Sequence, residues 1–149
     1  KYAVLKIYSK WMCESLMHLG YVPSNNSANT VPHMNEEFIP AFIRGLFDGD
    51  GCFSYEVSSK GLPSFNIVGG KEVIDFVSRY LKYKLNINVQ NKFERNMYWL
   101  DVSGFASVFS IMELLYNQAT VYLDRKYSKY MTWKDCMQRF GKLQVKDIV

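Results

Sequence analysis

The sequence lacks the features that mark several classes of protein. No run of apolar residues approaches the ~20 that a membrane-spanning helix needs, so we expect no membrane partner. The three cysteines, Cys13, Cys52 and Cys136, lie far apart, which argues against a zinc site and against a disulfide framework. Scattered, unpaired cysteines suit a reducing compartment, and we therefore expect an intracellular protein.

What is present suffices for one folded domain. The chain has 149 residues, of which 48% are hydrophobic and 21% charged, the usual composition of a globular protein. This composition excludes long disorder, which requires low hydrophobicity and high net charge. We expect Trp11, Trp99 and Trp133 to lie in the core.

The net charge of +4 comes entirely from one end of the sequence. Residues 1–123 carry 11 basic and 11 acidic side chains, whereas residues 124–149 carry seven basic and three acidic ones. A basic segment beside a neutral body is typical of a protein that binds a polyanion such as nucleic acid. A solvated helix face is the alternative explanation.

An internal repeat is suggested by the first residues. Residues 2–9 have the composition of a strand, and Ser9 is placed to cap a helix over 10–19. The strand 98–103, with Ser103 as the cap of a helix over 105–116, has the same arrangement. Residues 1–32 therefore read as the strand and helix that end a preceding half-domain, plus a linker.

Residues 33–149 form the main domain. A helix from about 35 to 50 precedes strands over 52–59 and 63–68, a helix over 71–85, strands over 89–95 and 97–103, and the helix 105–116. A basic helical region completes the chain. The order αββαββα predicts an α+β domain with a four-stranded antiparallel sheet.

The first helix of this domain ends in Asp48-Gly49-Asp50-Gly51. Glycine allows the backbone to approach a ligand closely, and carboxylate and carbonyl oxygens are the ligands that Mg²⁺ prefers. An ordinary turn, in which Asp48 closes the helix, is the alternative. The loop is not an EF-hand, because the spaced carboxylates and the closing glutamate are missing.

The nine residues Ile43-Arg44-Gly45-Leu46-Phe47-Asp48-Gly49-Asp50-Gly51 resemble the motif that names the LAGLIDADG homing endonucleases. The resemblance covers essentially the whole chain, since the later elements follow that family's order. Residues 119–127 resemble the stretch that closes the second half of two-motif members. This sequence has one motif, whereas family members are homodimers of one-motif chains or monomers with two motifs. The resemblance therefore implies a homodimer or pairing with a second LAGLIDADG half.

The resemblance also implies roles for single residues. Motif helices of the family pack against each other, and the small pair Ala41 and Gly45 permits this approach, while Asp48 closes the helix. Asp50 resembles the catalytic metal ligand, and the carbonyl of the preceding glycine, Gly49, is a second oxygen for Mg²⁺ or Mn²⁺. Lys126 resembles the catalytic basic residue placed near the attacking water, with a solvated lysine as the alternative.

A twisted antiparallel sheet can read base edges in the major groove of double-stranded DNA. The resemblance implies contacts at alternate strand positions and in the basic segment. The candidates are Ser54, Glu56, Ser58, Asn66, Gln90, Lys92, Glu94, Tyr98 and Arg125. For any one of them, a plain solvent-exposed face is the alternative.

The implied function is metal-dependent, site-specific cleavage of double-stranded DNA, in the cytoplasm of a bacterium or phage-infected cell or in an organelle. One alternative is a DNA- or RNA-binding protein on the same fold that does not cleave, such as a maturase or transcriptional regulator. Another is an inactive half-domain that needs a partner half. The acid at position 50 favours the enzyme.

Overall fold

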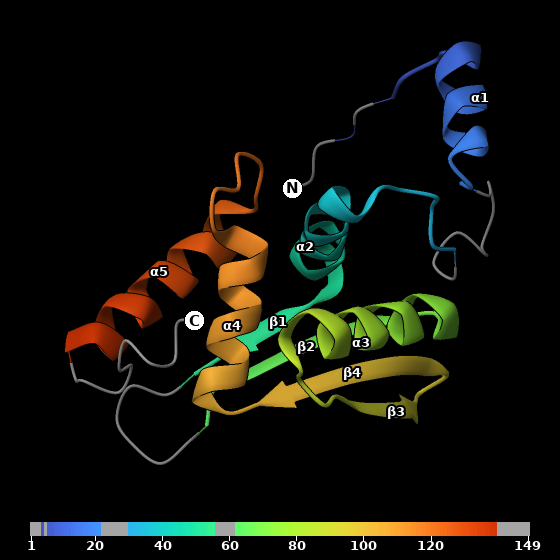
Figure 1. Ribbon diagram of the computed structural model, residues 1–149. Coiled ribbons are helices and arrows are strands. Elements are labelled where there is room, and N and C mark those ends of the chain that lie inside the picture. Colours follow the sequence, from blue (N-terminus) through green and yellow to red (C-terminus); the bar gives the residue numbers. More distant parts are fainter. Residues whose placement is uncertain (1–3, 5, 22–29, 56–61, 140–149) are drawn as a thin grey trace.

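The computed structural model describes residues 4, 6–21, 30–55 and 62–139. The main domain contains, in chain order, α2 (Ile39–Asp50), β1 (Cys52–Ser54), β2 (Ser64–Gly69), α3 (Lys71–Leu85), β3 (Gln90–Glu94), β4 (Met97–Ser103) and α4 (Phe105–Tyr116). Helix α1 (Lys10–His18) and a 3₁₀ turn, η2 (Glu36–Phe38), precede it, and α5 (Asp124–Arg139) follows. The predicted α+β class and αββαββα order are confirmed (Figure 1).

The four strands form one antiparallel sheet in the order β1-β2-β4-β3. Helices α2, α3 and α4 lie on one face of this sheet, and no described helix lies on the other face (Figure 1). We call these the helix-covered face and the open face. None of the described helices combines the length and hydrophobicity that crossing a bilayer requires.

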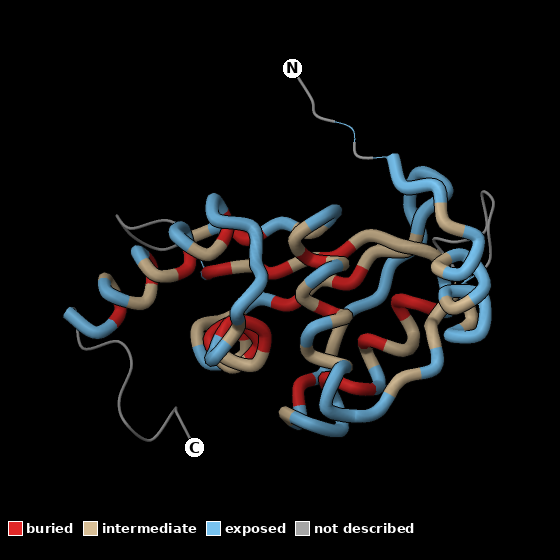
Figure 2. Tube along the Cα trace, turned by 90° about the horizontal axis from the view of Figure 1, so that it is seen from above, coloured by how far each residue is buried: buried red, intermediate tan, exposed pale blue. Residues whose placement is uncertain are grey.

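The core lies between the helix-covered face and the helices. Alternate strand residues such as Phe65, Ile67 and Leu100 are fully buried and meet Leu81 of α3 and Ile111 of α4 in one cluster. Because strand side chains alternate between the two faces, each buried residue leaves its neighbour on the open face. Figure 2 shows buried residues along the strands and the helices above them.

Residues with positive φ set the element boundaries that the sequence predicts best. Helix α3 ends at Asn86 in the left-handed conformation (φ 53°), a common helix terminator. Arg95 and Asn96, with φ of 52° and 63°, make the tight turn between β3 and β4, since two positive-φ residues match the twist of a hairpin. Gly104 (φ 107°), not Ser103, caps α4, because Ser103 still belongs to β4.

The N-terminal segment differs most from the prediction. Ser9 does cap α1, its hydroxyl accepting a hydrogen bond from the Met12 amide at 3.2 Å. Residues 4 and 6–9 are not in a strand, so that prediction is wrong for the described part. Helix α1 buries no residue (Figure 2), and its Trp11 is 76% exposed instead of lying in the core, whereas Trp133 of α5 is 1% exposed as expected. The assignment of residues 1–32 to a preceding half-domain stays a prediction.

Candidate functional site

Two sides of α2 hold the helix in the domain. Ile43 and Phe47 are fully buried in the core. On the neighbouring side of α2, Arg44 reaches the last turn of α4 and the segment after it. It donates from Nη1 to the Leu115 carbonyl (2.7 Å) and from Nε to the Val121 carbonyl (2.8 Å). The guanidinium group therefore binds the Leu115 carbonyl at the C-terminus of α4, where positive charge is favoured.

Asp48 lies one turn after Arg44 and binds the same region. Its carboxylate accepts hydrogen bonds from the Tyr116 hydroxyl (2.6 Å) and the Leu123 amide (2.9 Å). Burial and this charged acceptor raise the pKa of Tyr116, so the hydroxyl keeps its proton. Asp48 therefore ties α2 to α4 and the segment after it, a structural role that differs from capping its own helix.

A third side of α2 is open. Ala41, Gly45 and Gly49, spaced four residues apart, are exposed. A Cβ added at Gly45 or Gly49 would meet no described atom within 4 Å. This side, which we call the open row, thus has space for another helix to approach the α2 backbone.

Asp50 stands at the end of α2, directly after the open row. It is exposed, and its carboxylate makes no hydrogen bond or salt bridge with the described residues. Carboxylate and carbonyl oxygens at Asp50 and Gly49 suit Mg²⁺ or Mn²⁺ in kind. They do not suffice in number, because the described residues contain no group of three or more His, Cys, Asp or Glu that could hold a metal ion. The described residues of one chain therefore supply only part of a metal site.

Lys126, in the first turn of α5, lies against the same end of α2. It is 6% exposed, and its ammonium group donates to the Phe47 carbonyl and, at 2.6 Å, to the Gly51 carbonyl. Burial, and secondly the charge of Arg125, lower its pKa. The alternative of a solvated lysine is therefore wrong: sequence and fold bring Lys126 to the motif.

Further basic residues of α5 also bind the protein itself. Lys129 donates to the Phe53 carbonyl of β1 at 2.6 Å, and Lys134 pairs with Glu113 of α4 at 2.6 Å. The positive charge of the described part of this segment is thus partly structural. Arg125 is exposed in the first turn of the helix.

The strand register decides which predicted DNA contacts share a face. Residues directly opposite each other in paired strands project on the same side. The open face therefore carries five of the candidates, in rows set by the register: Ser54, Asn66, Gln90, Lys92 and Glu94. Glu56 and Ser58 lie outside the described residues.

Tyr98 lies on the opposite face of the sheet from the other candidates. It pairs with Phe93 and Gly69, packs against the core, and lies 6.0 Å from the ammonium group of Lys71 on α3. It therefore belongs to the helix-covered face, and its predicted place among the DNA contacts is wrong.

Trp99 and Asp101 are among the open-face residues that the prediction missed. Trp99 is half-buried on the open face, where its indole N–H donates to the Glu94 carbonyl at 3.2 Å, so its predicted core position is also wrong. Asp101 lies opposite Asn66 and Gln90. The sequence could have indicated both residues, because the aliphatic residues Leu100 and Val102 are buried and alternation then assigns the odd positions of β4 to the open face.

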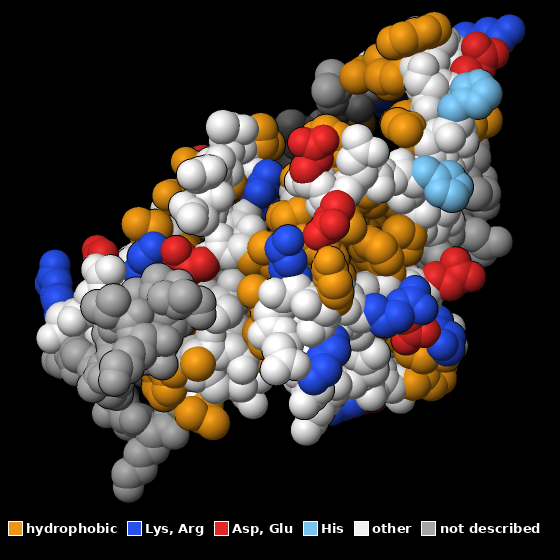
Figure 3. Space-filling model, in the orientation of Figure 1, with side chains coloured by type: hydrophobic (Ala, Val, Ile, Leu, Met, Phe, Trp, Pro, Cys, Tyr) orange, Lys and Arg blue, Asp and Glu red, His pale blue; other side chains and the backbone are white. Residues whose placement is uncertain are grey.

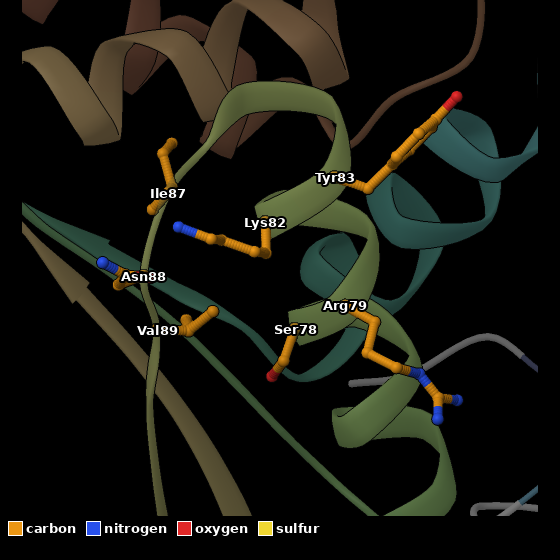
Figure 4. A pocket seen from close by; sticks show the side chains of 7 residues that line it. All are labelled: Ser78, Arg79, Lys82, Tyr83, Ile87, Asn88 and Val89. Atoms are coloured by element: carbon orange, nitrogen blue, oxygen red, sulfur yellow. The ribbon is translucent and has the colours of Figure 1, made fainter.

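The open face is hollowed at one end, where β3 begins and β4 ends. A depression of about 440 Å³ is lined by Ser64, Asn88, Gln90, Lys92, Asp101, Val102, Ser103 and Ser107. A second hollow, of about 390 Å³, lies between α3 and residues 87–89 (Figure 4). There the Arg79 side chain points away from the Lys82 amine and from Asn88, so its polar groups do not converge on one point.

The end of the molecule formed by α1 carries hydrophobic side chains beside charged ones (Figure 3). Hydrophobic side chains gather on α1 (Figure 3), including Trp11 and the partly exposed Leu16 and Leu19. The last two line a hollow of about 330 Å³ with Phe42 and Leu46 of α2. The fourth side of α2 thus faces α1.

Comparison with solved structures supports the fold. The chain is similar to the LAGLIDADG meganuclease I-AabMI bound to uncleaved DNA (17% identity, TM-score 0.53, 73% of this chain and 40% of that one). It is also similar to the archaeal intron-encoded homing endonuclease I-Vdi141I complexed with DNA (18%, 0.52, 76% and 77%). A third match is full-length DUF199/WhiA from Thermatoga maritima (15%, 0.50, 75% and 43%).

The chain thus spans less than half the length of the I-AabMI and WhiA chains that it matches. No curated protein matches the sequence. The family model described as a LAGLIDADG-like domain matches residues 37–122, which include all of α2, the sheet, α3 and α4. The chain belongs to the LAGLIDADG-like domain family.

Proposed function

We propose that the chain is one half of a metal-dependent, site-specific endonuclease for double-stranded DNA, completed by a second copy or a second half. The observation that carries this proposal is the exposed Asp50 carboxylate at the end of the open row of α2. Two such helices, packed through Ala41, Gly45 and Gly49, would bring two acids together. The DNA-bound relatives I-AabMI and I-Vdi141I support DNA as the partner.

Each group then has a distinct task. Asp50 and the Gly49 carbonyl would hold Mg²⁺ or Mn²⁺, which when bound supplies Lewis-acid stabilisation and an activated water. Lys126 holds the carbonyls at the end of α2 and so fixes the backbone that positions Asp50. The open face would read base edges with Ser54, Asn66, Gln90, Lys92 and Glu94, and Arg125 would contact phosphates.

The test uses DNA that the chain itself selects. Fragments are selected from a random pool in Ca²⁺, and then incubated with the chain in Mg²⁺. Asp50→Asn should retain binding and lose cleavage, because it removes a metal ligand without removing a DNA contact. Asp135→Asn, the same change at an exposed site in α5, is the control and should cleave normally. Cleavage by Asp50→Asn at the wild-type rate would overturn the metal-ligand role.

A second candidate is a DNA-binding protein on this fold that does not cleave, because the described residues of one chain hold only part of a metal site and cleavage depends on the pairing of two halves. A wild-type dimer that binds selected DNA but leaves it intact in both Mg²⁺ and Mn²⁺ would establish that candidate. A mass near 17.4 kDa in solution, measured by light scattering, would instead indicate a half that needs a different partner.

A further inference from the structure

An ion pair crosses from β3, an outer strand of the sheet, to β4 on the open face. Lys92 of β3 and Asp101 of β4 lie 2.8 Å apart, and their side chains are 56% and 33% exposed. They are diagonal neighbours, because Asp101 lies opposite Gln90 and Lys92 opposite Trp99. Both side chains line the depression of about 440 Å³.

The charge on this face is unusual for a surface proposed to bind DNA. Within the described residues, the strands place Lys92, Glu94 and Asp101 on the open face, and Arg95 of the hairpin turn pairs with Glu94 at 3.6 Å, so this surface has no excess of positive charge. The lysine among them is bound by a carboxylate. A surface that binds any DNA through its phosphates needs such an excess.

The chemistry around Asp101 fits a base edge better than a phosphate. Its neighbours in the depression include uncharged hydrogen-bonding groups, Ser64, Gln90 and Ser103. A carboxylate only accepts hydrogen bonds, and in the major groove the exocyclic amino group of cytosine is its typical donor. Where no amino group is presented, the same carboxylate loses water without gaining a partner.

We propose that Asp101 is a specificity-determining residue of the DNA-binding face, accepting a hydrogen bond from an exocyclic base amino group, foremost that of cytosine. This inference rests on the proposed function. Lys92 orients the carboxylate and, while paired with it, is not available as a general phosphate anchor. Asp101 thereby lowers affinity for unselected DNA and retains affinity where a base donor is present.

The experiment compares matched charge changes in the full chain. Asp101→Asn is tested against Asp75→Asn, which breaks a similar ion pair on α3. There Lys71 and Asp75 are 2.5 Å apart with side chains 59% and 36% exposed, on the other side of the sheet. DNA pools are selected with each variant and sequenced. Binding to the wild-type site and to random DNA is then measured over a range of salt concentrations.

Asp101→Asn should broaden base preference at one or two adjacent positions and lower the ratio of specific to random binding about tenfold. Random-DNA affinity should rise, and the slope of log affinity against log salt should steepen by about one as Lys92 becomes free to contact a phosphate. Asp75→Asn should match the wild type in base preference and in both affinities.

Three results would overturn the inference. A lower melting temperature of Asp101→Asn with an intact base preference would identify a stabilising cross-strand pair. Equal effects of Asp75→Asn would identify net charge as the cause. If Lys92→Gln loses the base preference and Asp101→Asn keeps it, the residue that contacts the base is Lys92. If the wild type binds no DNA even at low salt, the proposed function itself fails, and this inference with it.

Discussion

Two sides of α2 other than its buried side differ in what they contact. On one side, Arg44 and Asp48 bind backbone and hydroxyl groups at the end of α4 and beyond. On the other, Ala41 and Gly45 are exposed, and a Cβ added at Gly45 would meet no described atom within 4 Å. One helix therefore both fastens the domain and leaves a surface unused by it.

The two aspartates of the motif, Asp48 and Asp50, differ in the same way although they are only two residues apart. Asp48 accepts two hydrogen bonds from its own chain, whereas Asp50 is exposed and its carboxylate makes none with the described residues. The same side-chain type thus serves stability at one position and is free for a ligand at the other. Substitutions on the two sides should separate stability from pairing.

The largest effect on stability is expected at Lys126. Lys126→Met removes two charge-assisted hydrogen bonds, leaving the Gly51 carbonyl without this donor and the Phe47 carbonyl with the Gly51 amide alone, and should lower the free energy of unfolding by about 2–4 kcal/mol. Urea denaturation measures this change. Lys82→Met removes an exposed lysine that binds Asn86 and should change stability by less than about 0.5 kcal/mol. Equal, small effects of the two variants would contradict a structural role for Lys126.

Asp48→Asn should have a smaller effect. An amide can still accept from the Leu123 N–H and donate to the Tyr116 hydroxyl, which accepts as well as donates, so the loss is the charge assistance of the two hydrogen bonds, about 1 kcal/mol. Urea denaturation of Asp48→Asn and Asp50→Asn compares the contribution of each acid to the free energy of unfolding, because Asp50→Asn should unfold like the wild type. A destabilised Asp50→Asn would show that both acids hold the fold.

The smallest effect on stability, with the opposite sign, is expected on the open row. Gly45→Ala should raise the free energy of unfolding by about 0.5–1 kcal/mol, since alanine favours a helix and meets no neighbour. Gly45→Leu should also fold, yet it should prevent close packing of two α2 helices. Light scattering should then give a mass near 17.4 kDa, in contrast to a paired wild type. An unchanged dimer would place the interface elsewhere.

Local sequence signals were sufficient for much of the fold. Helices α3 and α4 and strand β4 have the predicted bounds, because Asn86, Asn96 and Gly104 mark their ends through positive φ. The signals failed where burial had to be assigned between two aromatic neighbours. Tyr98 and Trp99 are equally suited to a strand, and only the phase set by Leu100 separates the faces.

The site was predictable in part. The motif placed the small residues and Asp50 on α2, and the resemblance pointed to Lys126. No local pattern indicates that Arg44 binds carbonyls 71 and 77 residues away, or that Lys129 binds a strand 76 residues away. These contacts depend on how α4 and α5 return to α2, and therefore on the assembled fold.

The contact between Lys129 and β1 has a consequence for association. Strand β1 is one outer strand of the sheet, and an outer strand can recruit a strand from another molecule. The Phe53 carbonyl already accepts a hydrogen bond from Lys129, and α5 lies along this border with Trp133 packed on the Phe53 ring. The described part of β1 therefore has one backbone acceptor fewer to offer to a strand of another molecule, which disfavours extension of the sheet at this edge.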